Sequence, residues 1–272
     1  KSEEFIFDFF ERSLTSAEKL FKNIEFIFVN DNSPDNSEYL ISKINSNSTE
    51  LKLINLAHNY GHHKAIITGL KHASGDLIWL LDSDLEEQPE WIIPFYEKLK
   101  EEKADVIYGY NLYRKDTIIN NFFANLYYKI INCLIPYKIQ QNEITARLMT
   151  KDYKNALCSL NLNKPLIFLF HEAGFKQIAS PINKNYKGKS LYTFRMKLKI
   201  FLNSLMIYKL PIKLTIYTGL LFFVFSFINF IILFKNKLIF DHFLFINFYL
   251  LSITFCTGAI IFFIGINTLY IS

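Results

Sequence analysis

The sequence has few cysteines and no repeats, and these two absences narrow its class. Only three cysteines occur in 272 residues, at positions 133, 158 and 256, and no pair of them has CxxC spacing. The small number of cysteines and the absence of CxxC spacing argue against both a disulfide framework and a zinc site. Internal repeats and long low-complexity linkers are also missing. A solenoid or a largely disordered chain is therefore excluded.

Charge is absent from two long stretches, residues 214–234 and 243–272. A helix rises about 1.5 Å per residue, so roughly 20 residues cross a hydrocarbon layer of about 30 Å. Both stretches are long enough, and we expect a multi-pass anchor of two transmembrane helices. The alternative is a pair of buried core helices, but such helices ordinarily keep a polar face.

Positive charge is concentrated just before the first of these stretches. The net charge is +5, and the cationic residues between 184 and 213 are Lys184, Lys187, Lys189, Arg195, Lys197, Lys199, Lys209 and Lys213. Positively charged flanks stay in the cytoplasm. We therefore expect an inner-membrane protein whose large N-terminal part is cytoplasmic and whose basic segment contacts anionic membrane lipid. Nucleic-acid binding is the disfavoured reading of the same charge.

Short apolar runs alternate with helical patterns through the first 110 residues. The expected strands are 25–30, 51–56, 77–81 and 105–108, and the expected helices are 39–44, 64–72 and one that Pro89 opens and that runs through residue 103. This alternation predicts an α/β fold with a mostly parallel sheet and helices on both faces. Ligands of such sheets bind at the carboxyl ends of the strands, where Asp31 and Asp82 stand.

Two aspartates, Asp82 and Asp84, follow the expected strand 77–81 one residue apart. Such a pair can hold one hard divalent cation, Mg²⁺ or Mn²⁺, with substrate phosphates as the remaining ligands. The alternative is a solvated acidic turn that caps the next helix. The position at the ligand-binding edge of the sheet, with Asp31 at the end of another strand, favours the metal.

Residues 118–135 have pairs of apolar side chains every four residues, which is one broad stripe at helical spacing. Two interpretations stay open: a helix packed on the core, or a helix lying in the membrane interface. A second helix of this kind is expected over 190–210.

Several ordered motifs resemble one family. They include VNDNSPDNS (29–37), LAHNYGHHKAIITGL (56–70), ASGDLIWLLDSDLEEQPE (73–90), ADVIYGYNLYRKD (104–116) and RLMTKDYKNAL (147–157). Followed by two apolar spans, they resemble glycosyltransferase family 2 enzymes of the dolichol-phosphate mannose synthase type. The resemblance implies a GT-A, Rossmann-like domain over 1–185, a basic juxtamembrane segment over 186–212 and two transmembrane helices over 213–272.

The resemblance also implies roles for individual residues on the donor side. Asp31 matches the acid that contacts the nucleotide base. Asp82 and Asp84 match the pair that holds the metal against the donor diphosphate, and Asp84 is accordingly an expected catalytic residue.

On the acceptor side the resemblance implies three cationic residues. Arg114 and Arg147 match basic positions beside the acceptor phosphate, and Arg114 is the second expected catalytic residue. Lys189 belongs to a loop that closes over the site. Arginine grips phosphate through a planar fork, which suits these positions.

The implied activity is metal-dependent, inverting transfer of a sugar from a UDP- or GDP-linked donor to a polyprenyl (undecaprenyl) phosphate, in a pathway of cell-envelope polysaccharide. A phosphate monoester is largely ionised at neutral pH, so no strong base is required. The only acids near the pair that could act as one are Glu86 and Glu87. Whether the protein forms a homo-oligomer stays open.

Two alternatives remain. The first is a polysaccharide-elongating family 2 synthase, although the QxxRW motif of such enzymes does not occur. The second is an inactive, truncated membrane-bound remnant. Relatives begin with a strand that has no counterpart before Lys1, and they continue past the second span. We therefore expect this sequence to be truncated at both ends, or its gene product to be damaged, and we expect unpaired strand edges in the sheet.

Overall fold

The computed structural model describes residues 2–44, 50–112, 118–162, 164–183, 202, 204, 210–235 and 241–271. It divides into two compact units. The first comprises residues Lys1–Asn132 and Pro136–Ser190, and the second Cys133–Ile135 and Leu191–Ser272.

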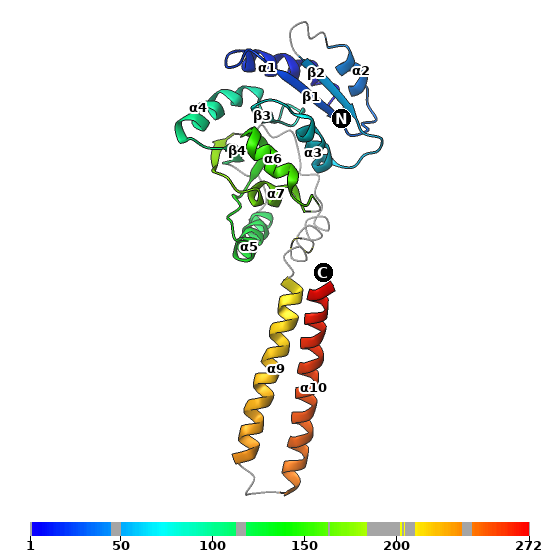
Figure 1. Cartoon of the computed structure of the whole chain (residues 1–272), viewed down its shortest axis with the longest axis vertical. Coiled ribbons are helices and arrows are strands. Elements are labelled where there is room, and N and C mark those ends of the chain that lie inside the picture. Colours follow the sequence, from blue (N-terminus) through cyan, green and yellow to red (C-terminus); the bar gives the residue numbers. More distant parts are fainter. Residues whose placement is uncertain are drawn as a thin grey trace. The chain divides into compact units, whose positions relative to one another are not determined.

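The first unit contains two β-sheets (Figure 1). β1 (Glu25–Asn30) pairs in parallel with β2 (Glu50–Asn55). The other sheet has the order β3-β5-β4-β6. Its strands are β3 (Leu77–Leu80), β4 (Val106–Asn111), β5 (Glu143–Thr150) and β6 (Gln177–Ile182). β4 and β6 are parallel, whereas β5 runs antiparallel to both β3 and β4.

The alternation of strands and helices expected for the first 110 residues is confirmed. β1 to β4 start within one residue of the predicted positions, and α2 (Ser37–Ser42), α3 (His62–His72) and α4 (Ile92–Glu102) separate them. A short 3-10 turn, η1 (Pro89–Trp91), leads into α4. The expected mostly parallel sheet is mixed instead, because the unpredicted strand β5 enters between β3 and β4 in the opposite direction.

β1 and β3 share no strand pairing among the residues the structure describes, although the same helices pack on both. α3 brings Gly69 close to Val29 of β1, and it shares a core with Ile78 and Leu80 of β3. On the other side, α1 (Ile6–Glu18) packs with β1 and with Leu81 and Leu85 beyond β3. Within the described part of the chain, each of the two strands thus has one edge without a strand partner.

Glu25, the first residue of β1, links that strand to the segment that enters β3. Its carboxylate accepts hydrogen bonds from the backbone N–H groups of Ser74 (2.6 Å) and Gly75 (3.0 Å), and from Lys52 (3.1 Å). Burial raises the pKa of Glu25, but these bonds outweigh burial and lower it to about 2. The Glu25 carboxylate therefore links β1 to the segment that enters β3, although β1 and β3 share no backbone pairing among the described residues.

The remaining elements of the unit complete its covering layers. α4 packs against β4 and β5 through Phe95 and Leu99. α6 (Lys151–Ser159) begins directly after β5, with the Thr150 side chain accepting from the N–H of Tyr153, and α7 (Leu166–Glu172) follows. Side chains from α3, α6 and α7 form one core with β4 and β5.

α5 (Ile118–Leu134) coincides with the predicted amphipathic helix. Its apolar stripe is divided along its length. Phe122 and Phe123 are 63% and 50% exposed, and Leu126 is also exposed, whereas Ile131 is completely buried. The first half of the stripe therefore presents a large apolar surface that no other described residues cover.

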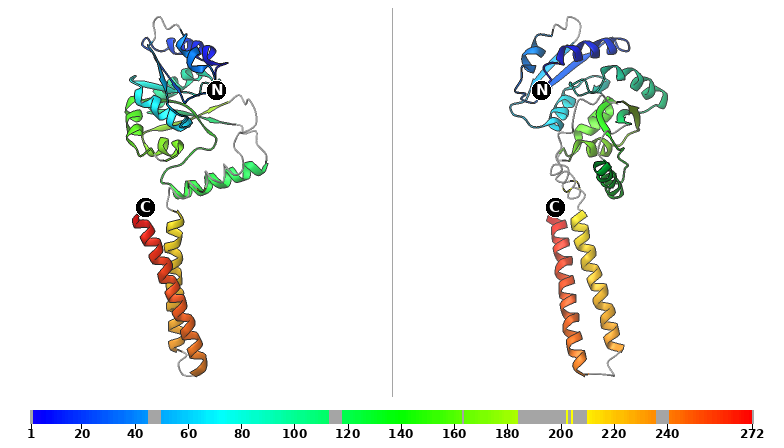
Figure 2. Two further views of the ribbon diagram at one scale, coloured as in Figure 1. Left: turned by 90° about the vertical axis from the view of Figure 1, so that its right-hand side faces the viewer. Right: turned by 180° about the vertical axis from the view of Figure 1, so that it is seen from behind.

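The second unit is a helical hairpin. α9 (Leu210–Lys235) and α10 (Asp241–Ile271) lie side by side, antiparallel, in all three views (Figures 1 and 2). The helices approach closely at glycines: a Cβ added to Gly219 would lie 2.7 Å from Cβ of Phe262. Ser226 donates a hydrogen bond to Thr254 (2.9 Å) across the interface.

Most apolar side chains of this hairpin point outward. The candidate membrane spans are Ile212–Ile232 and Tyr249–Thr268, and only 11% of either is buried inside the protein. The helices of a soluble core would bury these side chains, so their exposure favours the transmembrane interpretation over the core alternative. The second expected interface helix, over 190–210, lies almost entirely outside the described residues.

Candidate functional site

The acidic turn after β3 has a fixed conformation. Asp84 accepts a hydrogen bond from the N–H of Glu86 (2.9 Å) through Oδ1. Leu85 adopts a left-handed conformation (φ 57°) while its side chain is buried in the core beside α1. Such a conformation is unfavourable for leucine and persists only where surrounding contacts impose it, which is common at functional sites. The turn that displays Asp82 and Asp84 is therefore held by packing.

Asp31, at the end of β1, binds the turn that leads into α3. Its two carboxylate oxygens accept from the N–H groups of Tyr60 (2.7 Å) and Gly61 (2.8 Å). Gly61 has φ 91°, a conformation that strongly favours glycine. The next residue, His62, places Nε2 3.4 Å from Oδ1 of Asp82. One short turn thus brings the two predicted acidic sites, Asp31 and Asp82, to the same edge.

Asn30 supports the Asp31 turn from inside. It is buried, its amide donates to the side chain of Asn55 in β2 (3.0 Å), and its carbonyl oxygen accepts from the N–H of Ser33 (3.0 Å). An aspartate at position 30 could accept but not donate, so the bond to Asn55 requires the amide or a protonated acid.

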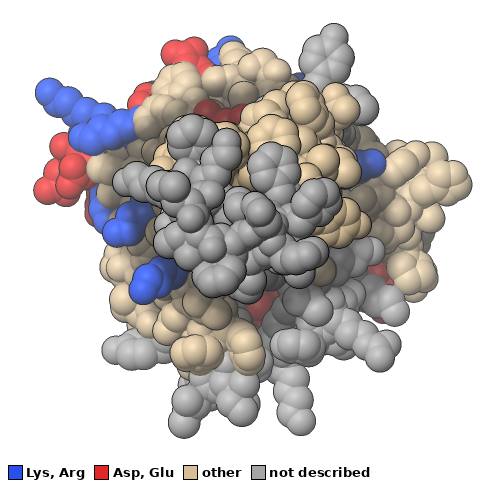
Figure 3. Space-filling model, turned by 90° about the horizontal axis from the view of Figure 1, so that it is seen from below, with Lys and Arg blue, Asp and Glu red and all other residues tan. Residues whose placement is uncertain are grey.

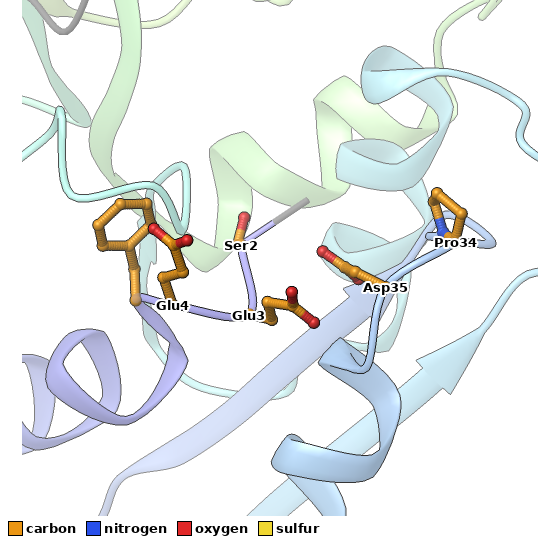
Figure 4. Close-up of a pocket in the computed structure, with 6 residues that line it drawn as sticks. Ser2, Glu3, Glu4, Pro34 and Asp35 are labelled. Atoms are coloured by element: carbon orange, nitrogen blue, oxygen red, sulfur yellow. The ribbon is translucent and has the colours of Figure 1, made fainter.

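A pocket of about 390 Å³ lies beside this edge (Figure 4). Ser2, Glu3, Glu4 and Phe5 line one side, and Pro34 and Asp35 of the loop after β1 line the other. Ser2 and Ser83 are joined through their hydroxyl groups (3.0 Å), which places the pocket next to the acidic turn. Its volume falls within the range of small-molecule sites, and its lining is acidic.

Two groups beside the site have perturbed protonation. Burial, and then the neighbouring His62, lower the pKa of His63, which favours the neutral ring. Burial raises the pKa of Asp35, but hydrogen bonds from Ser37 outweigh it, so its pKa lies below the usual range. Asp35 is therefore charged at neutral pH.

Arg147 does not face solvent. Its side chain is 1% exposed and donates to Glu143 (2.9 Å), which in turn contacts His171 (2.8 Å). The guanidinium also lies on the ring of Phe170, and its Nη1 has no hydrogen-bond partner among the described residues. Sequence reasoning missed Glu143 and His171, because no local motif joins them to Arg147.

The other predicted cationic residues, Arg114 and Lys189, lie outside the described residues. The predicted acceptor-phosphate roles of Arg114, Arg147 and Lys189 stay predictions. For Arg147, direct contact with a phosphate requires that its cluster with Glu143 opens or that the phosphate reaches Nη1 inside the protein.

The space-filling view in Figure 3 shows one face of the molecule. Lys and Arg side chains gather along one margin of it, and uncharged residues make up most of the remaining coloured surface.

The acidic turn fits a divalent cation that is shared with a ligand. Asp82 and Asp84 offer hard oxygen donors, whereas no group of three or more His, Cys, Asp or Glu side chains converges anywhere in the described part of the chain. Mg²⁺ and Mn²⁺ are commonly held in this way, by one or two carboxylates together with substrate phosphates. Asp82 and Asp84 would hold the cation, and the phosphates would complete its shell.

The first unit thus combines an α/β architecture with carboxylates that follow the carboxyl ends of β1 and β3. The family model described as "Glycosyl transferase family 2" matches residues 3–165, more than half of the chain. The chain therefore belongs to glycosyl transferase family 2, and the GT-A type of fold expected from the sequence is confirmed.

Individual relatives agree with this assignment. A Mycobacterium tuberculosis protein named as a glycosyltransferase is 36% identical over 228 residues, covering 83% of this chain and 66% of the relative. The chain thus spans slightly less than two thirds of that relative's length.

Two solved structures with a bound nucleotide sugar are also similar. S. aureus TarS 1-349 in complex with UDP-GlcNAc has 16% identity and a TM-score of 0.48, covering 78% of this chain and 63% of that one. The mannosyltransferase PcManGT from Pyrobaculum calidifontis, in complex with GDP-Man and Mn²⁺, has 15% identity and a TM-score of 0.43, covering 64% and 51%.

Proposed function

We propose that this protein transfers a sugar from a UDP- or GDP-linked donor to a polyprenyl phosphate at the cytoplasmic face of the membrane, with inversion at the anomeric carbon. The observation that carries the proposal is the convergence of Asp31 and Asp82 at the edge formed by the carboxyl ends of β1 and β3, which belong to different sheets. The same chain also has a hairpin of exposed apolar helices.

The donor would bind along this edge. We assign the nucleoside to the pocket beside the Asp31 loop, where carboxylates can accept from hydroxyl and N–H groups. The diphosphate would then lie towards Asp82 and Asp84. A divalent cation held there supplies positive charge for the departing nucleoside diphosphate, which gains negative charge as its bond to the sugar breaks.

The acceptor would supply its own nucleophile. A phosphate oxygen attacks the anomeric carbon, the bond from that carbon to the nucleoside diphosphate breaks, and the configuration inverts. The acceptor phosphate is already largely ionised, so this step needs no strong base. This matches the position of Glu87, which is buried with both oxygens hydrogen-bonded and is not placed to remove a proton.

The acceptor's long apolar tail stays in the membrane, so the site must operate at its surface. The hairpin would anchor the chain, and the exposed half of α5, with Phe122, Phe123 and Leu126, would insert into the interface. The basic residues between 184 and 213 would contact anionic headgroups. Donors of the UDP and GDP class are cytoplasmic, which agrees with the orientation expected from these charges.

The decisive experiment incubates membranes containing the protein with a panel of nucleotide sugars and undecaprenyl phosphate, and identifies the lipid product by mass. We expect one lipid-linked monosaccharide that forms only with a divalent cation. Growth of a longer saccharide would instead identify an elongating synthase, and no product with any donor would contradict the proposal.

Orientation has its own test. A cysteine at Lys237, between the spans, should react with an impermeant reagent outside intact cells, and a cysteine at Ser46 should not. The reverse pattern would place the site on the wrong side for a cytoplasmic donor.

A further inference from the structure

Glu87 occupies the place where pairing between β3 and β5 stops. The antiparallel ladder runs from Leu77 opposite Thr150 to Leu80 opposite Arg147. Continued in the same register, it would set Asp82 opposite Thr145. The ladder ends before this pair, and the chain turns away to display Asp82 and Asp84.

The N–H groups of that interrupted pair are bound by one carboxylate. Glu87 accepts from the N–H of Thr145 (3.1 Å) through one oxygen and from the N–H of Asp82 (3.3 Å) through the other. Its side chain is completely buried. The Glu87 side chain therefore replaces the backbone hydrogen bonds that Asp82 and Thr145 would otherwise exchange. It connects the acidic turn to the central strand β5.

The chemistry of this position favours a carboxylate over other side chains. Two N–H donors that point at one group need two acceptor oxygens, which an ionised carboxylate has. Glutamine has the same shape, but it would turn an NH₂ group towards one of the two donors. Burying a carboxylate is costly, and the two N–H donors offset part of that cost.

We propose that Glu87 is a positioning residue for the divalent cation and the donor diphosphate. By ending the ladder and holding the backbone of Asp82, it sets the direction in which the carboxylates of Asp82 and Asp84 point. This inference rests on the proposed function for the cation itself, but the experiment below separates the two.

The test measures Mn²⁺ affinity by electron paramagnetic resonance on the full chain, purified in detergent and kept well below its thermal midpoint. We expect Glu87→Gln to weaken Mn²⁺ binding by about tenfold or more, the usual effect of losing a group that orients a metal ligand. Glu87→Asp, which keeps both oxygens but is shorter, should fall between. The control is Glu101→Gln, an exposed acid on α4, which should bind as the wild type does.

A second measurement needs no metal. Hydrogen exchange in the peptides that contain Asp82 and Thr145 should accelerate in Glu87→Gln, whereas the peptides of α9 should not change. Weaker Mn²⁺ binding without faster exchange would make Glu87 a direct ligand and overturn the positioning role.

The remaining outcomes are equally decisive. A folded Glu87→Gln with unchanged Mn²⁺ affinity overturns the inference even if its thermal midpoint falls, because that result describes a purely structural group. If Glu87→Gln does not fold, Glu87→Asp is judged by the same criteria, and failure of both to fold also overturns it. If Asp84→Asn binds Mn²⁺ as well as the wild type, the cation role fails by itself, and the exchange rates then decide whether Glu87 fixes the turn.

Discussion

The two units of this protein place their apolar side chains in opposite ways. The first unit buries Phe9, Phe10 and Phe95 inside small cores and leaves charged turns at the surface. The hairpin exposes phenylalanines along its length and buries the hydroxyl of Ser226, which donates to the part-buried Thr254. The first arrangement is stable in water and the second in lipid. α5 combines both, because most of it belongs to the first unit but it exposes Phe122 and Phe123 as the hairpin exposes its phenylalanines.

The sharpest test of this division removes chemistry from the first unit while leaving its fold intact. Asp84→Asn should lower turnover by about 10² or more, since one proposed ligand of the charge-stabilising cation would be lost. Turnover is measured as lipid-linked product per minute with saturating donor. The control is Asp76→Asn, an exposed acid at the opposite end of β3.

Chelation provides the corresponding check on the wild type. Full activity in EDTA would remove the cation role from Asp82 and Asp84 together. That result would favour the alternative interpretation, in which the acidic turn only caps the helix that follows.

The next largest effect is expected from replacing the exposed apolar side chains of α5. Replacing both Phe122 and Phe123 with Asp should reduce transfer to a long-chain acceptor by about tenfold or more, because charged side chains cannot insert into the interface. Transfer to a short, water-soluble polyprenyl phosphate and cation-dependent donor binding should be preserved. Activity with both acceptors and donor binding are measured on the same preparation.

A matched control separates charge from position. Asn125→Asp combined with Lys129→Gln makes the same change in net charge on exposed residues of α5, and it should have little effect. If the phenylalanine variant loses donor binding too, the stripe is part of the core. If it slows both acceptors equally with donor binding intact, the interface role is wrong.

A third prediction addresses the helical hairpin. Gly219→Leu should separate the hairpin helices at a cost of about 1–3 kcal/mol, because any Cβ there would meet the backbone and Cβ of Phe262. The readout is oxidative cross-linking in membranes of a cysteine pair at Ser226 and Thr254, with the native cysteines replaced. Thr218→Leu, on the exposed side of α9, is the control, and equal cross-linking in both variants would refute close packing at Gly219.

The smallest effect concerns the first unit and the pH dependence of its stability. The folded pKa of Glu25 is about 2, below its ordinary value of 4.5, so its contribution is complete above about pH 4.5 and is lost as the pH falls towards 2. Glu25→Gln should cost about 1–2 kcal/mol at neutral pH and flatten the acid limb of the stability curve. Denaturant unfolding followed between pH 3 and pH 7 measures this, with the exposed Glu18→Gln as control. An unchanged acid limb in Glu25→Gln would mean that the link to Ser74 and Gly75 adds no stability.

Local patterns predicted the parts of the fold that depend on nearby residues. β1 and β3 are short apolar runs that end in turn residues, and the α5 stripe repeats at helical spacing, so each could be identified from its own segment. β5 was missed because it holds Glu143, Thr145 and Arg147, which disguise a buried strand. Two of these residues have partners distant in sequence: Glu87 accepts from the N–H of Thr145, and Glu143 contacts His171.

The same limit applies to the site. Asp31, Asp82 and Asp84 stand directly after strands, so their place at the sheet edge followed from topology. The Tyr60–His62 turn that brings them together, and the tie from Glu87 to Thr145, depend on side-chain reach across the fold. Residue spacing in the sequence does not predict which distant side chains will come into contact.

The sheet order β3-β5-β4-β6 also has a consequence for how the chain is made. β3 and β4 are synthesised first, but neither has its partner until β5, about forty residues after the start of β4, has left the ribosome. During this interval two apolar strands have open edges, and such edges pair readily with other chains. Translation speed over residues 106–150 should therefore influence the yield of soluble nascent protein, and chaperones that cover strand edges should matter most before β5 emerges.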